Sequence, residues 1–380
     1  MMLDNTAMKQ ALSAGEHPIL LDSPTQLENA AKQWEGSEVL GIDTEFVRER
    51  TYRANLGLVQ VSDGQTAWLV DPLAVGSLEP LARLMANTAI TKILHSSSED
   101  LEVLMYALGQ LPEPLVDTQI ASAMLGQPLQ MAYHHAVKWL FNISVDKDQT
   151  RSNWCRRPLS TRQLRYAAMD VVLLPMMLQR IKPRLEDAGH WEWLVEDVER
   201  MKRNSLTPVE PEKAYLRFPS IGRMDEPGLK ALQALASWRE ETAKEKNRAR
   251  GFVISDAGLM QLARLRPASD EEIREIEDVH PGALKRYQAQ LLRLITDSQS
   301  STTTVENIEK LSNYQNKQLK AMRRSVSESA RELGIDPALL ASKKELEKLI
   351  RAAATGRQIP ERFLGWRKEI ITEDLMPLLD

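Results

Sequence analysis

The sequence predicts an α/β domain with a mixed sheet at the start of the chain, followed by two all-helical domains. Short apolar runs alternate with helical patterns over roughly the first half of the 380 residues, which is typical of an α/β domain. Beyond that half, strand patterns are almost absent and helical patterns continue. Two segments rich in proline or serine, residues 205–222 and 298–304, interrupt the helical part. These breaks predict three domains, comprising residues 1–204, 205–297 and 298–380.

The predicted sheet begins with three apolar runs that lie close together along the chain. Residues 39–42, 56–61 and 66–70 are joined by brief connections, a pattern that predicts an antiparallel meander. Residues 91–95 predict a fourth strand, and residues 77–87 predict a helix between the third and fourth strands.

Helix signals dominate from residue 97 onward. Ser96 precedes Glu99 by three residues, the spacing of a capping box, and Gly109 ends the helical run. Residues 117–125 and 131–141 predict two further helices.

A second capping box is predicted at Ser160 and Gln163, at the start of a long helical run. Pro175 lies inside this run. Because proline removes a helical hydrogen bond and clashes with the preceding turn, the run is expected to bend or divide there.

Composition excludes several classes of protein. Hydrophobic residues make up 43% and charged residues 27% of the chain, and the formal charge of −4 gives no overall attraction for a polyanion. Cys155 is the one cysteine, which excludes a disulfide framework and a cysteine-rich zinc site. No apolar run approaches the roughly 18 residues of a membrane span, and the N-terminal segment lacks the pattern of a secretory signal. A cytoplasmic protein without a membrane partner is expected.

The charge is unevenly distributed along the chain. Residues 1–204 carry 20 basic and 26 acidic residues, a net charge of −6, whereas residues 205–380 carry 29 and 27, a net charge of +2. An acidic first domain suits a site that holds cations, and a mildly basic remainder suits a module that contacts phosphates. Chance variation between domains is the alternative explanation.

The strongest chemical signal is the pair Asp43 and Glu45 in the segment IDTEF. Both follow a predicted strand and lie two residues apart, so their side chains are expected on one face. Two carboxylates on one side of a strand repel each other unless a cation lies between them. A hard divalent cation such as Mg²⁺ or Mn²⁺ is the usual partner of such a pair. The alternative is a solvated turn.

Two further acidic signals follow along the chain. Asp100 is expected in the first turn of the helix after the fourth strand, where α/β proteins form their sites, although an acid there also favours the helix dipole. Tyr166 and Asp170 lie four residues apart and share one face of a helix. The small residues Ala167 and Ala168 between them allow a close approach to a sheet or a substrate.

The order of these motifs, D-x-E, then Asp, then Y-x₃-D, resembles the tyrosine-bearing subgroup of the DEDD 3′–5′ exonuclease superfamily. The surrounding segments IDTEFVRERTY, LGLVQVSDG, LHSSSEDLEVL and RPLSTRQLRYAAMDVVLL resemble the ribonuclease D family over about residues 38–185. The serine-rich HSSSED departs from relatives that often have Ala-Gly before the serine. In the helical part, ASWRE and ARGFVISDAGLMQLA resemble a helicase-and-RNase-D C-terminal (HRDC) domain, and ALLASKKELEKLI resembles a second, more divergent copy.

The resemblance implies an α/β ribonuclease H-like exonuclease domain with a mixed sheet, followed by two all-α HRDC-like helical domains. It also implies two divalent metal ions, Mg²⁺ or Mn²⁺, which stabilise the attacking and leaving oxygens of a phosphodiester. By this resemblance Asp43 bridges the two ions, Glu45 and Asp170 complete one of them, and Asp100 holds the other. Tyr166 is expected to orient the attacking water. The implied activity is that of a 3′–5′ exoribonuclease that releases 5′-mononucleotides, with tRNA precursors and other structured small RNAs as substrates.

Four residues are candidates for direct contact with RNA. Phe46 has an aromatic ring that can stack on a base, and Arg48 is a candidate phosphate contact. Arg248 and Arg250 end a segment, residues 239–250, whose basic residues can follow an RNA backbone. Core packing for Phe46 and a solvated surface for the arginines are the alternatives.

Two other functions stay open from the sequence. A DNA 3′–5′ exonuclease would carry the same acids, because the choice of RNA depends on contacts to the 2′-hydroxyl that need geometry. A catalytically weak nucleic-acid-binding protein would have lost a carboxylate, and none is lost here. His95 and Asp117, near the motifs, are interpreted as structural, with Asp117 as a helix cap. A monomer is expected.

Overall fold

The computed structural model describes residues 5–145, 152–219, 221–302, 304–306 and 310–379. Contacts among them divide the chain into two compact units. The larger unit holds the described residues within 1–47, 56–206 and 311–380. The smaller unit holds those within 48–55 and 207–310.

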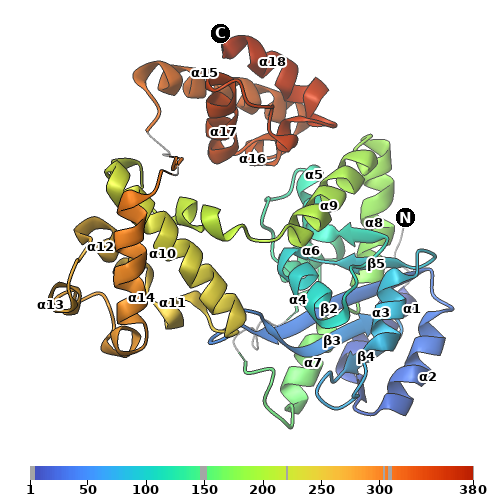
Figure 1. The fold of residues 1–380 in the computed structure, drawn as a ribbon. Helices are drawn as coiled ribbons and strands as arrows, with labels where there is room; N and C mark the ends of the chain where they lie inside the picture. The colour runs from blue at the N-terminus through green and yellow to red at the C-terminus, as the bar shows by residue number, and fades with distance from the viewer. Residues whose placement is uncertain (1–4, 146–151, 220, 303, 307–309, 380) are drawn as a thin grey trace. The chain divides into compact units, whose positions relative to one another are not determined.

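The larger unit is built around a sheet whose described strands lie in the order β1-β4-β3-β2-β5-β6 (Figure 1). β3 and β4 pair antiparallel, whereas β1 pairs parallel with β4, β2 with β5, and β5 with β6. The sheet is therefore mixed, as predicted. Its strands are β1 (Ile19–Leu21), β2 (Val39–Val47), β3 (Asn55–Ser62), β4 (Ala67–Val70), β5 (Thr91–Leu94) and β6 (Leu115–Asp117).

The predicted strands are all present, and two further strands were not expected. β2, β3 and β4 are neighbours in the sheet, as the predicted meander requires. β2 continues to Val47, five residues past its predicted end at residue 42. β1 and β6 have only three residues each, too few to show an alternating pattern in the sequence.

Helices of the larger unit surround the sheet, and α4, α7, α8 and α9 contact its strands. The core between them is formed by aliphatic side chains such as Leu40, Ile42 and Ile93, which are completely buried. The helices are α1 (Asn5–Glu16), α2 (Pro24–Trp34), α3 (Glu79–Ala86), α4 (Ser98–Leu108), α5 (Thr118–Met124), α6 (Tyr133–Phe141), α7 (Thr161–Met169), α8 (Leu174–Asp187) and α9 (Trp191–Leu206).

The start of α4 differs from the prediction. Its N-cap is Ser97 rather than Ser96, and no side chain caps the helix there. The Ser97 hydroxyl instead donates to the carboxylate of Asp117, 2.8 Å away. Ser96 has a φ of 64°, a left-handed conformation that a capping residue does not adopt. The predicted capping box of Ser96 and Glu99 was therefore wrong, because Ser96 precedes the N-cap and has a left-handed conformation.

The second capping box and the break at Pro175 are confirmed. The side chains of Ser160 and Gln163 bond reciprocally to each other's backbone at the start of α7. α7 ends at Met169 and α8 begins at Leu174, with Pro175 in its first turn. Proline is favoured in a first turn, since the amide hydrogen that it lacks has no helical partner there.

The smaller unit is helical, and its first segment is more ordered than the predicted linker at residues 205–222. Tyr215, Phe218 and Ile221 from that segment are buried in the core of the unit. The described elements are the 3₁₀ helices η1 (Pro211–Arg217) and η2 (Ile221–Arg223), and the α-helices α10 (Glu226–Glu245), α11 (Arg250–Val253), α12 (Asp256–Leu265), α13 (Asp270–Arg274) and α14 (Pro281–Ser300).

The second predicted linker, residues 298–304, begins inside α14, which continues to Ser300. The hydroxyl of Ser298 donates to the carbonyl of Ile295 within the same helix, so a serine is accommodated in the final turn. Residue 303 of the predicted linker lies outside the described residues.

The C-terminal helices belong to the larger unit. They are α15 (Asn313–Leu333), α16 (Pro337–Leu340), α17 (Lys343–Ala354) and α18 (Glu373–Leu375), with the 3₁₀ helices η3 (Glu361–Phe363) and η5 (Met376–Leu378) and the π-helix η4 (Lys368–Thr372). Contacts alone therefore do not separate residues 311–380 from the first domain. The boundaries at residues 204 and 297 stay predictions.

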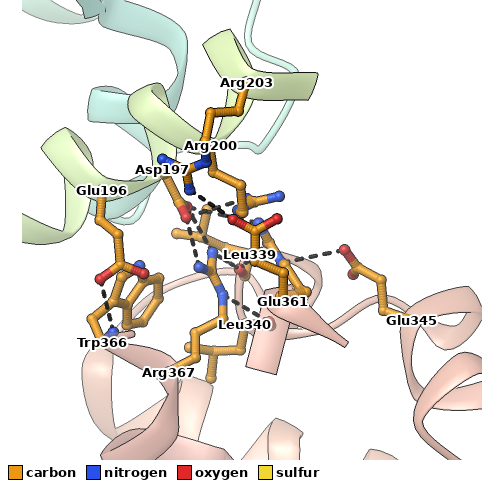
Figure 2. A network of polar contacts seen from close by, with 11 residues as sticks. Glu196, Asp197, Arg200, Arg203, Leu339, Leu340, Glu345, Glu361, Trp366 and Arg367 are labelled. Atoms are coloured by element: carbon orange, nitrogen blue, oxygen red, sulfur yellow. Dashed lines mark hydrogen bonds and ion pairs between the residues drawn. The ribbon is translucent and has the colours of Figure 1, made fainter. Parts of the chain in front are cut away.

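A buried ion pair fastens these C-terminal helices to α9. The guanidinium of Arg367 donates to both carboxylate oxygens of Asp197, each at 2.6 Å, and also to the carbonyls of Leu339 and Leu340 (Figure 2). Asp197 is 3% exposed and Arg367 only 1% exposed. Burial alone would raise the pKa of Asp197, but its hydrogen bonds and ion pairs with arginines lower it below the usual value.

Aromatic and backbone contacts extend this interface. Trp193 of α9 stacks on Trp366 with ring centroids 4.3 Å apart, and the Glu196 carboxylate accepts the amide hydrogen of Trp366. Gly365 has a φ of 60°, and a β-carbon there would overlap the Glu196 carboxylate. Glycine is therefore required at this position, both for its backbone conformation and for the approach of α9.

We expect Asp197→Asn to lower the free energy of unfolding by about 3–5 kcal/mol, because it leaves the Arg367 charge buried without a counter-ion. Urea unfolding followed by tryptophan fluorescence measures this loss. The control Arg203→Gln breaks an exposed pair with Glu361 and should cost less than about 1 kcal/mol. The double variant Asp197→Leu/Arg367→Met should recover only part of the loss. An apolar pair needs no counter-ion, but Arg200 and Arg362 still lose Asp197 as a partner. Equal effects of Asp197→Asn and Arg203→Gln would contradict this account.

Candidate active site

Three carboxylates meet beside the central strand β2. Asp43 and Glu45 lie within β2, two residues apart, and Asp170 follows the last residue of α7. One oxygen from each of the three lies within 4.8 Å of the others, an arrangement that can hold a metal ion. The prediction that Asp43 and Glu45 share a face is thus met within the strand rather than after it.

A glycine lets the chain beside Asp170 approach this strand. A β-carbon at Gly41 would lie 2.7 Å from the carbonyl oxygen of Val171, closer than side chains approach a backbone. Ala167 and Ala168 of α7 are fully buried in the core. Glycine at position 41 therefore lets the chain beside Asp170 lie against β2, so the spacing of the carboxylates depends on a residue that carries no charge.

Tyr166 lies one helical turn before Asp170. The amide of Asp170 donates to the Tyr166 carbonyl at 3.2 Å, which continues the helical pattern past the end of α7. The Tyr166 hydroxyl also forms a hydrogen bond with the Asp170 side chain. The sequence spacing therefore predicted correctly that the two side chains share one face.

Asp100 is held apart from the three-carboxylate cluster. It lies in the first turn of α4, as predicted, and its Oδ1 accepts a hydrogen bond from the Thr44 hydroxyl on β2. Thr44 and Asp100 are both buried. Asp100 is near enough to Asp43 for their charges to interact, so the fourth acid borders the cluster without belonging to its closest group.

Asp117 orders the chain that leads to Asp100. One carboxylate oxygen of Asp117 accepts the amide and the hydroxyl of Ser97, at 2.7 and 2.8 Å. The other accepts the amides of Gln119 and Ile120, and so caps α5. This confirms the interpretation of Asp117 as a helix cap, and it shows that the same side chain also fixes the start of α4.

The four carboxyl groups have raised pKa values because burial disfavours their charged forms and, at Asp43 and Glu45, because the neighbouring carboxylates repel. Burial followed by the charges of Asp100, Asp170 and Glu45 raises the pKa of Asp43 well above its usual value. Burial and the charges of Asp170 and Asp100 raise the pKa of Glu45 to about 9. Burial raises the pKa of Asp100 and of Asp170 to about 7, against opposing hydrogen bonds from Thr44 and Tyr166.

This donor set fits a hard divalent cation. Carboxylate oxygens are the ligands that Mg²⁺ and Mn²⁺ prefer, and a bound cation would reverse the electrostatic cost of placing these acids together. Asp43, Glu45 and Asp170 supply the closest group of oxygens, and Asp100 is the fourth acid beside them.

Two further residues border the site, and one was missed from the sequence. Burial and then the charge of Asp170 raise the pKa of Tyr133 well above its usual value, and the Tyr133 hydroxyl donates to the carbonyl of Met169. Nothing in the sequence pointed to Tyr133, because it lies outside the acidic motifs and only the fold brings α6 to the end of α7. His95 was interpreted as structural, and its two ring nitrogens contact Thr118 and the carbonyl of Met131.

The candidate RNA contacts lie in different settings. Phe46 is half-buried on β2 and Arg48 is exposed. Arg250 of the smaller unit forms a two-bond ion pair with Glu240, at 2.5 and 2.6 Å, and its guanidinium lies over the ring of Tyr52. The charge of Arg250 is thus already neutralised within the protein.

Family models match three parts of the chain. A 3′–5′ exonuclease model matches residues 18–186, an HRDC domain model matches residues 228–295, and a model of the C-terminal HRDC domain of ribonuclease D matches residues 313–375. The ribonuclease D of Pseudomonas paraeruginosa is 36% identical over 359 residues, which cover 93% of this chain and 95% of that protein. The chain belongs to the ribonuclease D family.

A solved structure of a ribonuclease D agrees with this assignment. The crystal structure of Escherichia coli RNase D, an exoribonuclease involved in structured RNA processing, has a TM-score of 0.89 and 30% sequence identity. The match covers 96% of this chain and 98% of that one. The predicted fold class, an exonuclease domain with a mixed sheet followed by HRDC domains, is confirmed. As a ribonuclease D, the chain is a 3′–5′ exoribonuclease. None of the helices in the described residues is long and apolar enough to cross a membrane.

We expect Asp43→Asn to raise the melting temperature of this ribonuclease D at pH 8 in EDTA. Because the folded-state pKa values lie above about 4, the unfolded value, the metal-free folded state holds more protons than the unfolded state. This contribution to stability is therefore fully present below about pH 4 and is lost progressively as the pH rises to about 7 for Asp100 and Asp170 and to about 9 for Glu45. The amide removes one repelling charge, so the variant should lose less stability between pH 6 and pH 8 than the wild type.

Differential scanning fluorimetry at the two pH values measures this difference. Mg²⁺ should raise the melting temperature of the wild type more than that of the variant, since a ligand stabilises only the form that binds it. Glu99→Gln removes an exposed charge beside Asp100 and serves as the control. A wild type and an Asp43→Asn variant with equal pH dependence in EDTA would show that repulsion within the cluster is negligible.

Proposed function

We propose that the chain removes nucleotides one at a time from RNA 3′ ends by two-metal-ion catalysis, and that it acts in the 3′-end maturation of tRNA. The observation that carries the catalytic part is the group of Asp43, Glu45 and Asp170, whose oxygens lie within 4.8 Å of one another. Bound divalent ions would stabilise the charge that develops on the attacking and leaving oxygens of the phosphodiester. The products are 5′-mononucleotides and an RNA chain with a free 3′-hydroxyl.

The proposed role of each acid follows from its neighbours. The charge of Asp43 interacts with those of all three other acids, which suits a ligand shared between the two ions. Glu45 and Asp170 lie closest to Asp43 and complete one ion site. Asp100, held by Thr44 at the border of the cluster, serves the other. We propose Mg²⁺ or Mn²⁺ for both positions.

Tyr166 is proposed to orient the attacking water. Its hydroxyl is bonded to Asp170, so it lies at the carboxylate cluster rather than in the apolar core. Since tyrosine has a pKa of about 10, it is a poor base near neutral pH. Its role is therefore to hold the water in position by a hydrogen bond at Oη.

The choice of substrate rests on family membership. Escherichia coli RNase D is described as involved in structured RNA processing. We extend this to the present chain and propose tRNA precursors and other structured small RNAs as its substrates, with a monomeric enzyme acting in the cytoplasm. Phe46 and Arg48, near the end of β2, and Arg248 in the smaller unit are proposed to contact the RNA.

We expect Asp43→Asn and Asp170→Asn each to reduce hydrolysis below a few per cent of wild-type turnover, because each removes a charge that the ions need. The measurement is release of mononucleotides from 3′-labelled RNA in Mg²⁺, with EDTA as the blank. Glu99→Gln, which lies outside the cluster, should retain its activity. Substantial turnover by both variants would contradict the metal assignment.

The same assay decides between RNA and DNA. A matched 3′-labelled DNA strand should be degraded more slowly than the RNA. Equal rates on both would favour the DNA exonuclease, and no release from either in Mg²⁺ or Mn²⁺ would favour a binding protein.

We expect Tyr166→Phe to slow the chemical step by a factor of about 10²–10⁴, the scale of a positioned acid–base group. Single-turnover cleavage at saturating RNA and Mg²⁺ measures this step. Binding of the metal should change little, because the carboxylates remain. Tyr133→Phe is the matched control. It removes a hydroxyl that bonds to the Met169 carbonyl rather than to a carboxylate, so its loss should be smaller. A Tyr166→Phe rate within twofold of wild type would remove the tyrosine from the mechanism.

A further inference from the structure

Arg157 ties the segment that leads into α7 to the sheet. Its guanidinium donates to both carboxylate oxygens of Asp71, from Nε at 2.5 Å and from Nη2 at 2.6 Å. It also donates to the carbonyls of Gly57 and Trp154, each at 2.7 Å, and to that of Arg156 at 3.0 Å. All five N–H donors of the guanidinium therefore have an acceptor. Gly57 lies in β3 and Asp71 directly follows β4, so these bonds hold the segment against two strands.

The backbone of this segment also packs closely on β3. A β-carbon at Gly57 would lie 2.7 Å from the carbonyl oxygen of Trp154, so a larger residue at position 57 would displace the segment. Asp71, the counter-ion of Arg157, is 4% exposed, and its Oδ1 also accepts the amide hydrogen of Leu73 at 2.9 Å. Both ends of the ion pair are thus fixed by further contacts.

The anchored segment places the ring of Trp154 against that of Tyr166. Trp154 is 1% exposed, and the two ring centroids lie 6.1 Å apart with 34° between the ring planes. Aromatic pairs in contact have centroids roughly 4.5–7 Å apart. The indole nitrogen of Trp154 is buried and has no hydrogen-bond partner within the described part of the chain. Trp154 therefore contributes a flat apolar surface rather than a hydrogen bond.

We propose that Trp154 is a positioning residue for Tyr166, and that Arg157 and Asp71 hold Trp154 in place. The inference rests on the proposed function, since it bears on the reaction only if Tyr166 orients the attacking water.

The position of Tyr166 within α7 fixes its backbone but not the direction of its ring, which still turns about two side-chain torsions. The buried indole beside the ring limits this rotation and keeps the hydroxyl bonded to Asp170. A displacement of about 1 Å at a reacting group can slow a reaction on the order of 10²-fold, so the support of this ring has a kinetic consequence.

The test combines Trp154→Leu with Tyr166→Phe in the full-length protein. Single-turnover cleavage of saturating RNA in Mg²⁺ is measured at a temperature where every variant is folded. Trp154→Leu alone should slow cleavage by about tenfold to a hundredfold, because the Tyr166 hydroxyl is no longer held in position. In the Tyr166→Phe background the same substitution should change the rate by less than about twofold, since the hydroxyl that it positions is already absent. Trp154→Phe should restore most of the wild-type rate, because it keeps an aromatic ring.

Arg157→Lys tests the same proposal without altering the Trp154 ring. It keeps the positive charge but offers fewer donors and no planar fork, so it loosens the segment alone. It should slow cleavage severalfold when Tyr166 is present and have little effect in the Tyr166→Phe background. This variant decides the question even if Trp154→Leu does not fold.

Trp34→Leu is the matched control. Trp34 of α2 is also 1% exposed, its ring centroid also lies 6.1 Å from that of an aromatic neighbour, Trp68, and its indole nitrogen also lacks a partner among the described residues. Trp34→Leu should lower the melting temperature about as much as Trp154→Leu but leave the cleavage rate unchanged.

Equal slowing by Trp34→Leu and Trp154→Leu would overturn the proposal, because general loss of packing would explain both. Undiminished slowing by Trp154→Leu in the Tyr166→Phe background would also overturn it, since Trp154 would then act by another route. A slow Tyr166→Phe beside Trp154→Leu and Arg157→Lys variants of wild-type rate would defeat this inference alone. A Tyr166→Phe variant of wild-type rate would instead refute the proposed role of the tyrosine, and the inference with it.

Discussion

Repulsion between like charges at the centre of the sheet is the constraint on which the active site depends. One oxygen each of Asp43, Glu45 and Asp170 lies within 4.8 Å of the others. Burial makes all three carboxyl groups hard to ionise, and at Asp43 and Glu45 the charges of the neighbouring carboxylates make ionisation harder still. A flexible scaffold would let them separate. The fold prevents this with the close approach of Gly41 to the chain beside Asp170, and the start of α4, ordered by Asp117, holds the fourth acid, Asp100, beside them.

The same constraint explains why uncharged residues matter as much as the acids. Gly41 allows the close approach of the chain beside Asp170, and a larger side chain there would overlap the Val171 carbonyl and push that chain away from β2. Tyr133 supports the end of α7 through the Met169 carbonyl. The catalytic chemistry therefore depends on packing as well as on the carboxylates, because a cation of fixed size is bound well only when its ligands are held at suitable distances.

The helical parts of the chain are attached in ways that their composition does not reveal. The C-terminal helices are fastened to α9 by the buried pair of Asp197 and Arg367, so deleting them would leave Asp197 without its partner. A truncation at residue 205 would therefore disturb the larger unit as well as remove the smaller one, so point variants test the proposed RNA contacts more cleanly. In the smaller unit, the net positive charge of the sequence is a poor guide, since Arg239 and Arg250 are neutralised by Asp256 and Glu240.

The sequence by itself predicted the mixed α/β first domain, the helical remainder and the capping box at Ser160, because each depends on local periodicity or on short spacings along the chain. Its resemblance to a nuclease family predicted the four acids and Tyr166 as one site. Tertiary structure decided which serine begins α4, since Asp117 competes for its hydroxyl, and it alone brought Tyr133 to the site. It also decided that the proline-rich segment around Tyr215 is core rather than linker. These features depend on contacts between residues far apart in the chain. A local sequence pattern carries no information about which distant group a polar side chain will bond to or an apolar side chain will pack against.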